Sequence, residues 1–381
     1  MNNTIQPLSA RSLPLDALRG IVMVIMALRH AEIFLTSIIT PMELWDGPMP
    51  IPKTGWPYWS RCIGHICPTA FFFLLGTGMM LFTQSRKKMG WTNHKILSHF
   101  IIRGGMLMLL QFFLENPLWY FDNPSRVYPD HVQVIFYFGV LFSLGAAIII
   151  SILLINLKTP ALALISLAIL SAPHFLLPVP TEHRIEYPVI ARILLVAGQT
   201  DHTLVRFPIV PWCGITILGI IFGRLLMRNY RRAFAYAGIT GIIGILLFVA
   251  IRLHGGFGNL RPYTGGDWRL FFFLTKMPPS IAYLTATLGI TGIILWILSL
   301  FESKFNPQNN LFIIYGKSPL FFYFMHMALL ALFGQLFFRH GACLAGMHLV
   351  WIAVLTVLYP CCKWYSAFKQ KQSPESLWRL L

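Results

Sequence analysis

Charged side chains are scarce in this chain. Asp, Glu, Lys and Arg together make up 11% of its 381 residues, whereas a soluble domain carries about a quarter. Hydrophobic residues make up 56%, so the polar side chains that would cover a soluble protein of this length are missing. The composition excludes a large water-soluble core and indicates that lipid replaces water around most of the chain.

Acidic residues are the scarcer of the charged groups. The 13 Asp and Glu stand against 30 Lys and Arg, which gives a net charge of +17. In a soluble protein this excess would suggest a nucleic-acid partner. Here the basic residues gather in short connections between apolar runs, which is typical of loops kept on the cytoplasmic side of a membrane. We therefore expect a multi-pass protein of the cytoplasmic (inner) membrane that binds no nucleic acid.

Three other features are missing. The six cysteines show no zinc-binding spacing, so no metal is expected. No internal repeat is visible, which counts against a transporter built from inverted repeats. The first apolar run is too long for the core of a signal peptide and has no small-residue cleavage site. We therefore expect no cleavable signal peptide.

Long apolar runs dominate what is present. A membrane-spanning helix needs about 20 mostly apolar residues, and about ten runs meet that rule. They predict an all-α polytopic bundle of about ten transmembrane helices that forms one transmembrane domain over 1–381. Pro278 and Pro279 predict that the eighth run begins as a kinked or interfacial segment, and the stretch 189–197 is short enough to be re-entrant. The runs lie at 13–39, 66–84, 99–121, 132–155, 160–178, 207–227, 233–252, 271–301, 311–337 and 345–366.

The basic residues predict the orientation. They crowd the second connection, the sixth connection and the tail, and with ten spans these three places fall on one side of the membrane. Both termini are then cytoplasmic. The clusters are Arg86, Lys87, Lys88 and Lys95; Arg224, Arg228, Arg231 and Arg232; and Lys363, Lys369, Lys371 and Arg379.

Ionisable side chains inside the spans are costly and are functional candidates by default. Asp16 and Arg19 are three residues apart, so they share a helix face near the cytoplasmic end and can pair. His30 lies about 20 Å further along the same run, in the outer half of the membrane. Equivalent counting brings four more side chains to the outer third or its edge: His65, Glu115, His326 and Lys276.

This shared layer predicts a catalytic site. A neutral histidine beside a carboxylate can act as a general base, so the five outer residues are catalytic candidates. Two plainer interpretations stand beside it. Histidines near helix ends often bond to a carbonyl across an interface, and Glu115 could be the ion-pair partner of Lys276 or Arg29. Near the inner end, Arg103 could meet a cofactor phosphate or simply follow the positive-inside rule.

Five stretches of the sequence together resemble the bacterial branch of the heparan-α-glucosaminide N-acetyltransferase catalytic-domain family, within the integral-membrane acyltransferases. They follow in order over most of the chain. The stretches are Arg11-x-x-x-Leu15-Asp16-Ala17-Leu18-Arg19-Gly20 with His30; Arg61-x-x-x-His65-x-Cys67-x-x-x-Phe71-Phe72-Phe73-Leu74-x-Gly76; Phe207-Pro208-x-x-Pro211-Trp212-x-Gly214; Lys276-x-Pro278-Pro279-Ser280 with Thr287-Leu288-Gly289; and Gly316-x-x-Pro319-Leu320-Phe321-Phe322-Tyr323-x-x-His326.

The resemblance implies a transmembrane acetyl transfer from cytosolic acetyl-CoA to a hydroxyl or amine, commonly of a sugar or glycolipid, on the outer side. It implies that His30 is the catalytic group. The family's usual acid before that histidine is replaced by Arg29, so Glu32 or Glu115 would supply the carboxylate. The other implied roles are oxyanion stabilisation or orientation of His30 by Lys276 or His65.

The inner and outer ends of the site have their own implied residues. Asp16, Arg19 and Arg103 are the candidates at the cofactor end. Arg61 and Trp212 are candidates for acceptor binding, although a tryptophan of this kind can equally belong to the aromatic belt at the interface. Membrane lipid surrounds the protein, and a homodimer is compatible with the sequence.

Two other functions stay open at this point. The first is a proton-coupled transporter or flippase for a lipid-linked or anionic solute, in which the same His and Glu side chains form a proton relay. The second is a haem protein in which two of the three histidines at like depth are axial ligands.

Overall fold

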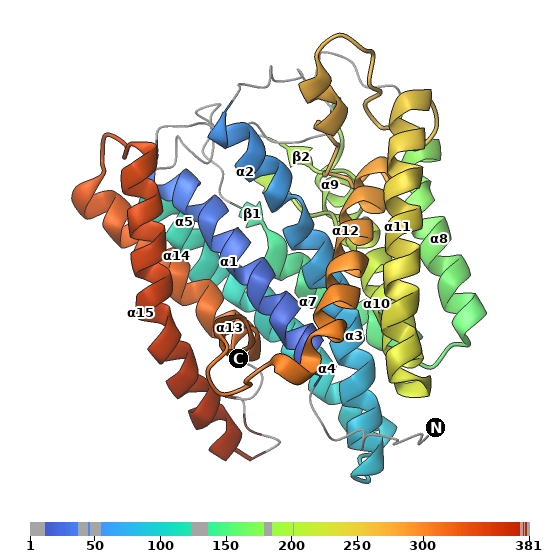
Figure 1. Cartoon of the computed structure of the whole chain (residues 1–381). Coiled ribbons are helices and arrows are strands. Elements are labelled where there is room, and N and C mark those ends of the chain that lie inside the picture. The colour runs from blue at the N-terminus through green and yellow to red at the C-terminus, as the bar shows by residue number, and fades with distance from the viewer. Residues whose placement is uncertain are drawn as a thin grey trace.

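The computed structural model describes residues 12–36, 45, 55–122, 136–178, 185–200, 202–373, 376 and 378. Long helices run side by side in one bundle (Figure 1), and the described chain is mostly helical. Its helices are α1 (Leu13–Leu35), α2 (Trp56–Gly64), α3 (Ile66–Lys88), α4 (Asn93–Leu110), α5 (Asn116–Asp122), α7 (Val140–Leu154), α8 (Thr159–Leu176), α9 (Val189–Leu194), α10 (Ile209–Arg228), α11 (Tyr230–His254), α12 (Ile281–Leu300), α13 (Leu311–Lys317), α14 (Pro319–Phe337) and α15 (Leu344–Lys371).

Eight helical segments of the described chain are long and apolar enough to cross a membrane, so the protein is a polytopic helical membrane protein. Two further helices lie among them. The helix α1 carries four charged residues, and α7 has only 15 residues. The count of ten crossings stays a prediction. The eight segments are Trp56–Lys88, Asn93–Phe121, Thr159–Leu176, Ile209–Arg228, Tyr230–His254, Ile281–Leu300, Pro319–Phe337 and Leu344–Lys371.

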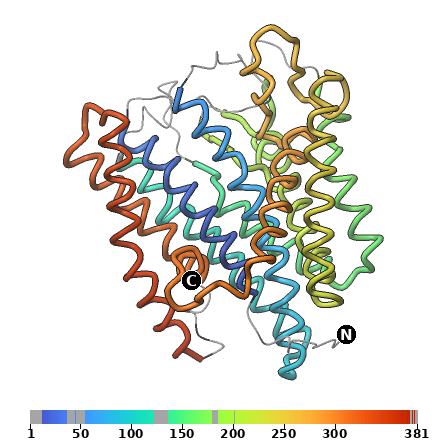
Figure 2. Tube along the Cα trace, viewed as in Figure 1, coloured from blue at the N-terminus to red at the C-terminus, as the bar shows by residue number. Residues whose placement is uncertain are grey.

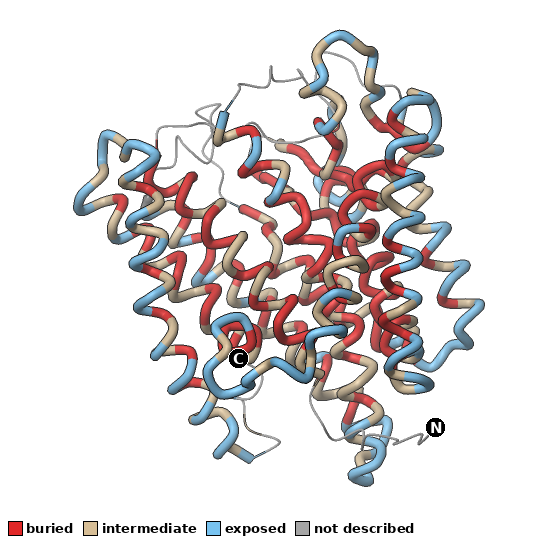
Figure 3. Tube along the Cα trace, in the orientation of Figure 1, coloured by how far each residue is buried: buried red, intermediate tan, exposed pale blue. Residues whose placement is uncertain are grey.

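The outer surface of the bundle suits lipid. Leucines on α8, α11 and α15 are about two-thirds exposed, for example Leu164, Leu246 and Leu349. Buried residues instead fill the middle of the bundle, around α1, α3 and α10 (Figure 3). Because apolar side chains point outward as well as inward, the hydrophobic effect of water cannot be what organises this surface.

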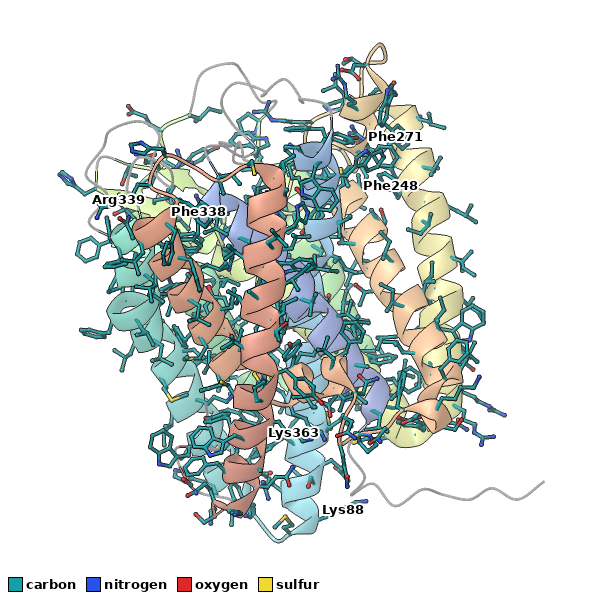
Figure 4. All side chains as sticks on the ribbon, turned by 60° about the vertical axis from the view of Figure 1, so that its left-hand side comes forward. Lys88, Phe248, Phe271, Phe338, Arg339 and Lys363 are labelled. Carbon is teal, nitrogen blue, oxygen red and sulfur yellow. The ribbon has the colours of Figure 1, made fainter. Side chains whose placement is uncertain are left out.

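The basic connections meet at one end of the bundle. Lys87 and Arg224 both bond to the segment between α7 and α8, through Asn156 Oδ1 and through the carbonyls of Ile155 and Leu157. Lys88 and Lys363 lie towards that same end, opposite Phe271 and Arg339 (Figure 4). The predicted gathering of these clusters on one side is therefore observed, and which side is cytoplasmic stays a prediction.

A few predicted runs differ from the observed helices. The run 311–337 is two helices, because Ser318 takes non-helical angles between α13 and α14. The run 271–301 becomes helical only at Ile281, after a 3-10 turn at Trp268–Phe272 and a non-helical stretch with the two prolines. Another 3-10 turn, Glu302–Lys304, follows α12. The end of the first run, 37–39, lies outside the described residues.

Besides the predicted helical bundle, the described chain contains a small sheet that was not predicted from the sequence. The strands β1 (Phe136–Phe138), β2 (Gly198–Gln199) and β3 (Thr203–Val205) form a small sheet in the order β1-β3-β2, with β1 parallel to β3. Residues at 132–138 were expected to be helical, and those described there are β1 instead. Within the stretch 189–197, Val189–Leu194 form the short helix α9, which contacts β3.

Close backbone contact holds α13 against α1, which the tubes show side by side (Figure 2). A Cβ at Gly20 would lie 1.8 Å from the carbonyl oxygen of Phe312, and a Cβ at Gly316 would lie 1.9 Å from that of Asp16. Only glycine permits this approach. Arg19 lies on this part of α1, near the end predicted to be cytoplasmic. The contact therefore fixes the position of Arg19 relative to α13 and α14.

Candidate active site

One cavity of about 510 Å³ runs through the bundle between α1, α3, α4, α7 and α14. Its wall is apolar in the middle, with Met23, Leu74 and Leu144. Basic side chains line it in two sets. Arg19, Arg103, Lys317 and Lys369 belong to the helix parts near the basic connections, and Arg29, Arg61, Arg206 and Lys276 surround the opposite part.

Two histidines meet at that opposite part. His30 Nδ1 lies 2.8 Å from His326 Nε2, and the two ring planes differ by 4°. His326 is fully buried, and its Nδ1 lies 2.8 Å from the carbonyl oxygen of Phe322. His30 lines the cavity, whereas His326 lies behind it. The helices α1 and α14 thus bring together two residues that are 296 positions apart.

Glu115 joins this site through Trp119. The Trp119 Nε1 donates to Glu115 Oε1 at 3.2 Å, and the Trp119 ring meets the edge of His30 at 5.4 Å between centroids. Glu115 is the last residue of a π-helical turn, Gln111–Glu115, and Trp119 lies in α5, the helix that follows it. Turns of this kind re-aim side chains and often occur at functional sites. Here the turn presents Glu115 to the cavity.

The π turn is held by Gln111. Its Oε1 accepts from the backbone N–H groups of Leu141 and Phe142, at the N-terminus of α7, and its Nε2 donates to Asn116 Oδ1 at 2.8 Å. Asn116 donates in turn to the carbonyl of Tyr137 in β1. These hydrogen bonds therefore link the π turn that carries Glu115 to α7 and to the small sheet.

The carboxylate expected beside His30 is elsewhere. Arg29 forms an ion pair with Glu32 and donates to Ser60 Oγ at 2.8 Å, and Ser60 Oγ donates to Glu32 Oε2 at 2.7 Å. The Glu32 carboxylate is thus held by Arg29 and Ser60. The direct partner of His30 is the second histidine.

Lys276 and His65 line the same cavity. Lys276 lies in the non-helical stretch before α12, with its Nζ 5.8 Å from the centre of the Phe207 ring. His65 lies at the junction of α2 and α3, and its carbonyl accepts from the Tyr283 hydroxyl at 2.7 Å. Lys276 is also close enough to His30 for its charge to act on the ring.

At the other part of the cavity the predicted Asp16–Arg19 pair is confirmed. Arg19 Nη1 donates to Asp16 Oδ1 at 2.9 Å and to the carbonyl of Gly316 at 3.1 Å. Asp16 itself is buried and does not line the cavity. The ion pair and the Gly316 carbonyl hold the Arg19 guanidinium against the α1–α13 contact.

Arg103 differs from Arg19. It lines the cavity within electrostatic range of Arg19. Its Nε is buried without a hydrogen-bond partner, and no described residue accepts from its guanidinium. A half-buried cation without a counter-ion attracts an anion. The two guanidiniums therefore make this part of the cavity suited to an anion.

The two acceptor candidates have different surroundings. Arg61 lines the cavity, with its guanidinium carbon 4.0 Å from the centre of the Phe273 ring. Trp212 is fully buried between Phe72 and Phe207 and is not part of the cavity wall. Trp212 supports Phe207 from behind, and the aromatic residues of the cavity wall include Trp119, Tyr137 and Phe207.

Metal and haem chemistry gain no support from this geometry. The direct N–N contact of His30 and His326 is 2.8 Å, and an axial pair would need about 4 Å to admit an iron between its nitrogens. Within the described residues, no group of three or more His, Cys, Asp or Glu is placed to hold a metal.

Sequence reasoning missed several cavity residues. Arg206 lies directly before the Phe207-Pro208 stretch and lines the cavity, within electrostatic range of His30. The same rule that selected Lys276, a cation at the edge of an apolar run, would have selected it. Tyr323 lies three residues before His326 on α14, and its ring lies 6.1 Å from that of His30. The helix face on which Tyr323 lies can be worked out only when α14 is known to begin at Pro319.

Comparison with known families gives one match. The model of the family described as heparan-alpha-glucosaminide N-acetyltransferase, catalytic, matches residues 11–251, which is more than half of the chain. The match contains the first three of the five stretches above, with His30, His65, Arg103 and Glu115. Lys276 and His326 lie beyond it. A search of curated proteins found no match.

Proposed function

Because the chain belongs to the heparan-α-glucosaminide N-acetyltransferase catalytic-domain family, we propose that it moves an acetyl group across the membrane. The donor is acetyl-CoA on the cytoplasmic side. The acceptor is a hydroxyl or amine, of a sugar or glycolipid, on the outer side. The protein acts as one domain in the cytoplasmic membrane, with ten crossings and both termini inside.

The single observation that carries the proposal is the cavity. It joins the Arg19 and Arg103 guanidiniums to the His30 ring through an apolar middle. The two ends are about 17 Å apart along α1, since 11 residues separate Arg19 from His30. A donor that has a polyanionic head, a long neutral arm and a thioester at its tip matches this order of basic, apolar and catalytic parts.

Donor binding uses the basic end. Arg103 supplies an unsatisfied guanidinium, and Arg19 is held in place by Asp16 and the Gly316 carbonyl. Guanidinium–phosphate contacts are strong, charge-assisted hydrogen bonds. Lys317 and Lys369 add positive charge to the same end. We assign the CoA phosphates to this set.

Transfer takes place at His30. Its imidazole removes the proton from the acceptor O–H or N–H as the acceptor oxygen or nitrogen attacks the thioester carbonyl carbon. The tetrahedral intermediate collapses with cleavage of the carbon–sulfur bond, and the thiolate of CoA takes the proton back from the His30 imidazolium. Lys276 and His65 line the same space and are the groups we assign to the developing oxyanion.

The acceptor enters from the outer part. Arg61 and the aromatic walls, Trp119, Tyr137 and Phe207, face the cavity there. Aromatic faces suit the apolar face of a sugar ring, and the arginine suits its hydroxyls or an attached anionic group. An acetyl-His30 intermediate is the stepwise variant of the same chemistry.

Acetyl-CoA binding to detergent-purified protein tests the proposal. We expect calorimetry to show binding in the wild type, weaker binding in Arg19→Ala, and unchanged binding in His30→Ala, because chemistry and phosphate recognition lie at opposite parts of the cavity. No binding by folded wild-type protein would reject the proposal. Solute uptake without acyl-CoA would then favour the proton-coupled transporter.

A further inference from the structure

His326 has a different role from the other site residues, because it touches His30 but does not line the cavity. We infer that His326 is a positioning residue that fixes the tautomer of His30, so that His30 Nε2 is the atom that takes the proton. This inference rests on the proposed function for its catalytic meaning. Its structural content stands on two hydrogen bonds.

The first step is the His326 tautomer. A carbonyl oxygen can only accept, so His326 Nδ1, at 2.8 Å from the Phe322 carbonyl, carries the hydrogen. His326 is fully buried, and its ring packs against the rings of Phe322, Tyr323 and His30, none of which carries a carboxylate. A charged imidazolium there would lack a counter-ion. His326 is therefore neutral, and its Nε2 is a hydrogen-bond acceptor.

The second step is the His30 tautomer. Because His326 Nε2 accepts, His30 Nδ1 must donate across the 2.8 Å contact. Direct ring-on-ring packing would hold the atoms about 3.5 Å or more apart, so this is a hydrogen bond and not a stack. The ring planes differ by 4°, and the ring centroids lie 5.0 Å apart. The bond therefore lies in the plane of both rings.

The third step is the reactive atom. With its hydrogen on Nδ1, neutral His30 has a free lone pair on Nε2, and no described residue donates to that nitrogen. Edge contacts from Phe34, Trp119 and Tyr323 surround the ring at 5.4–6.4 Å between centroids and limit its rotation. Proton uptake at Nε2 leaves the Nδ1–H···Nε2 bond intact, so the imidazolium formed during transfer keeps its partner.

Two hydrogen bonds thus link the Phe322 carbonyl to His326 and His326 to His30. Together they orient the catalytic histidine as a buried carboxylate does in other nucleophile–base systems. This arrangement also explains how the site functions with Arg29 where an acid was expected. Glu32 is taken up by Arg29 and Ser60, and a second histidine orients the first. The charged groups near His30 are Arg29 on α1 itself, and Arg206 and Lys276 from other segments; Glu115 lies behind Trp119.

Nitrogen NMR of protein labelled with 15N-histidine tests the inference without any activity. The His30 signals, assigned by their loss in His30→Gln, should show a protonated Nδ1 and an unprotonated Nε2 at a pH where the ring is neutral. In His326→Leu, which removes the acceptor, we expect this preference to be lost. A wild-type His30 with its hydrogen on Nε2 would overturn the inference even if the protein is fully active.

Turnover with acetyl-CoA and free glucosamine as the probe acceptor supplies the second readout. We expect kcat to fall at least tenfold in His326→Leu with KM for acetyl-CoA unchanged, and to recover in part in His326→Gln, whose side-chain oxygen can accept from His30. Unchanged kcat in His326→Leu would refute the positioning role. Absence of transfer in the wild type would count against the proposed function while the NMR result still decides the tautomer. If His326→Leu does not fold, the wild-type spectrum and His326→Gln carry the test.

Discussion

Replacing Arg103 by methionine should weaken donor binding without weakening the fold. Arg103 faces the cavity beside Arg19, and within the described chain its guanidinium has no acceptor. One charge-assisted hydrogen bond to a phosphate contributes about 1.5–3 kcal/mol, so the Kd for acetyl-CoA should rise about 10- to 150-fold. Because methionine removes a half-buried cation whose Nε has no hydrogen-bond partner and keeps the volume, the thermal midpoint of the ligand-free protein should stay unchanged or rise.

Arg224→Met is the matched control. Arg224 lies at the same end of the bundle but does not line the cavity, and it bonds to Thr159 and to the carbonyls of Ile155 and Leu157. The Arg224→Met substitution should lower the thermal midpoint and leave the Kd for acetyl-CoA unchanged. Calorimetry and a melting curve on each variant check both. Equal affinity of Arg103→Met and wild type, or a large loss of stability in Arg103→Met, would refute the assignment of Arg103 to a phosphate.

Three stability predictions follow from buried contacts, each read from thermal unfolding in detergent. Arg252→Ala should cost at least about 3 kcal/mol, because it removes four hydrogen bonds that tie α11 to the segment before α12; an unchanged midpoint would contradict this. Gly76→Ala should destabilise the protein, since its Cβ would lie 1.9 Å from a carbonyl oxygen of α10. Gly105→Ala on α4 is the control: its Cβ would meet nothing within 4 Å, so this substitution should be neutral or stabilising. Glu32→Gln should lower the thermal midpoint, because it removes the buried carboxylate charge that pairs with Arg29; a midpoint equal to that of the wild type would show that the pair is dispensable.

The arrangement of helices followed from simple rules. Apolar runs of sufficient length predicted the long helices, since lipid demands that each crossing satisfies its own backbone. Spacing of three predicted the Asp16–Arg19 pair, and a constant rise per residue brought His30 and His326 to one depth. These features depend on local sequence alone.

Features that depend on partners far along the chain could not be predicted in this way. A histidine was not expected in place of the carboxylate beside His30, because depth counting gives no rotation about the helix axis. The π turn that aims Glu115 is held by Gln111 bonds to α7, 30 and 31 residues away. The break at Ser318 is different, because Pro319 follows it directly and disfavours helical angles in the residue before it, so this break could have been predicted. The strand at Phe136–Phe138 is apolar enough to pass for helix.

Trp212 illustrates a limit of the family pattern. Its place in the Pro211-Trp212-x-Gly214 stretch suggested contact with an acceptor, yet its ring lies in the core behind Phe207. A pattern marks a residue whose type matters, and packing can be the reason as readily as binding.

The most direct test of the central claim is acetyl transfer across a sealed membrane. Proteoliposomes would carry radiolabelled acetyl-CoA on the side of the basic connections and glucosamine on the other side, with wild type compared with His30→Ala. The account predicts labelled N-acetylglucosamine on the acceptor side with the wild type alone, and no leak of acetyl-CoA. Equal product with His30→Ala, or product only where donor and acceptor share one side, would contradict it.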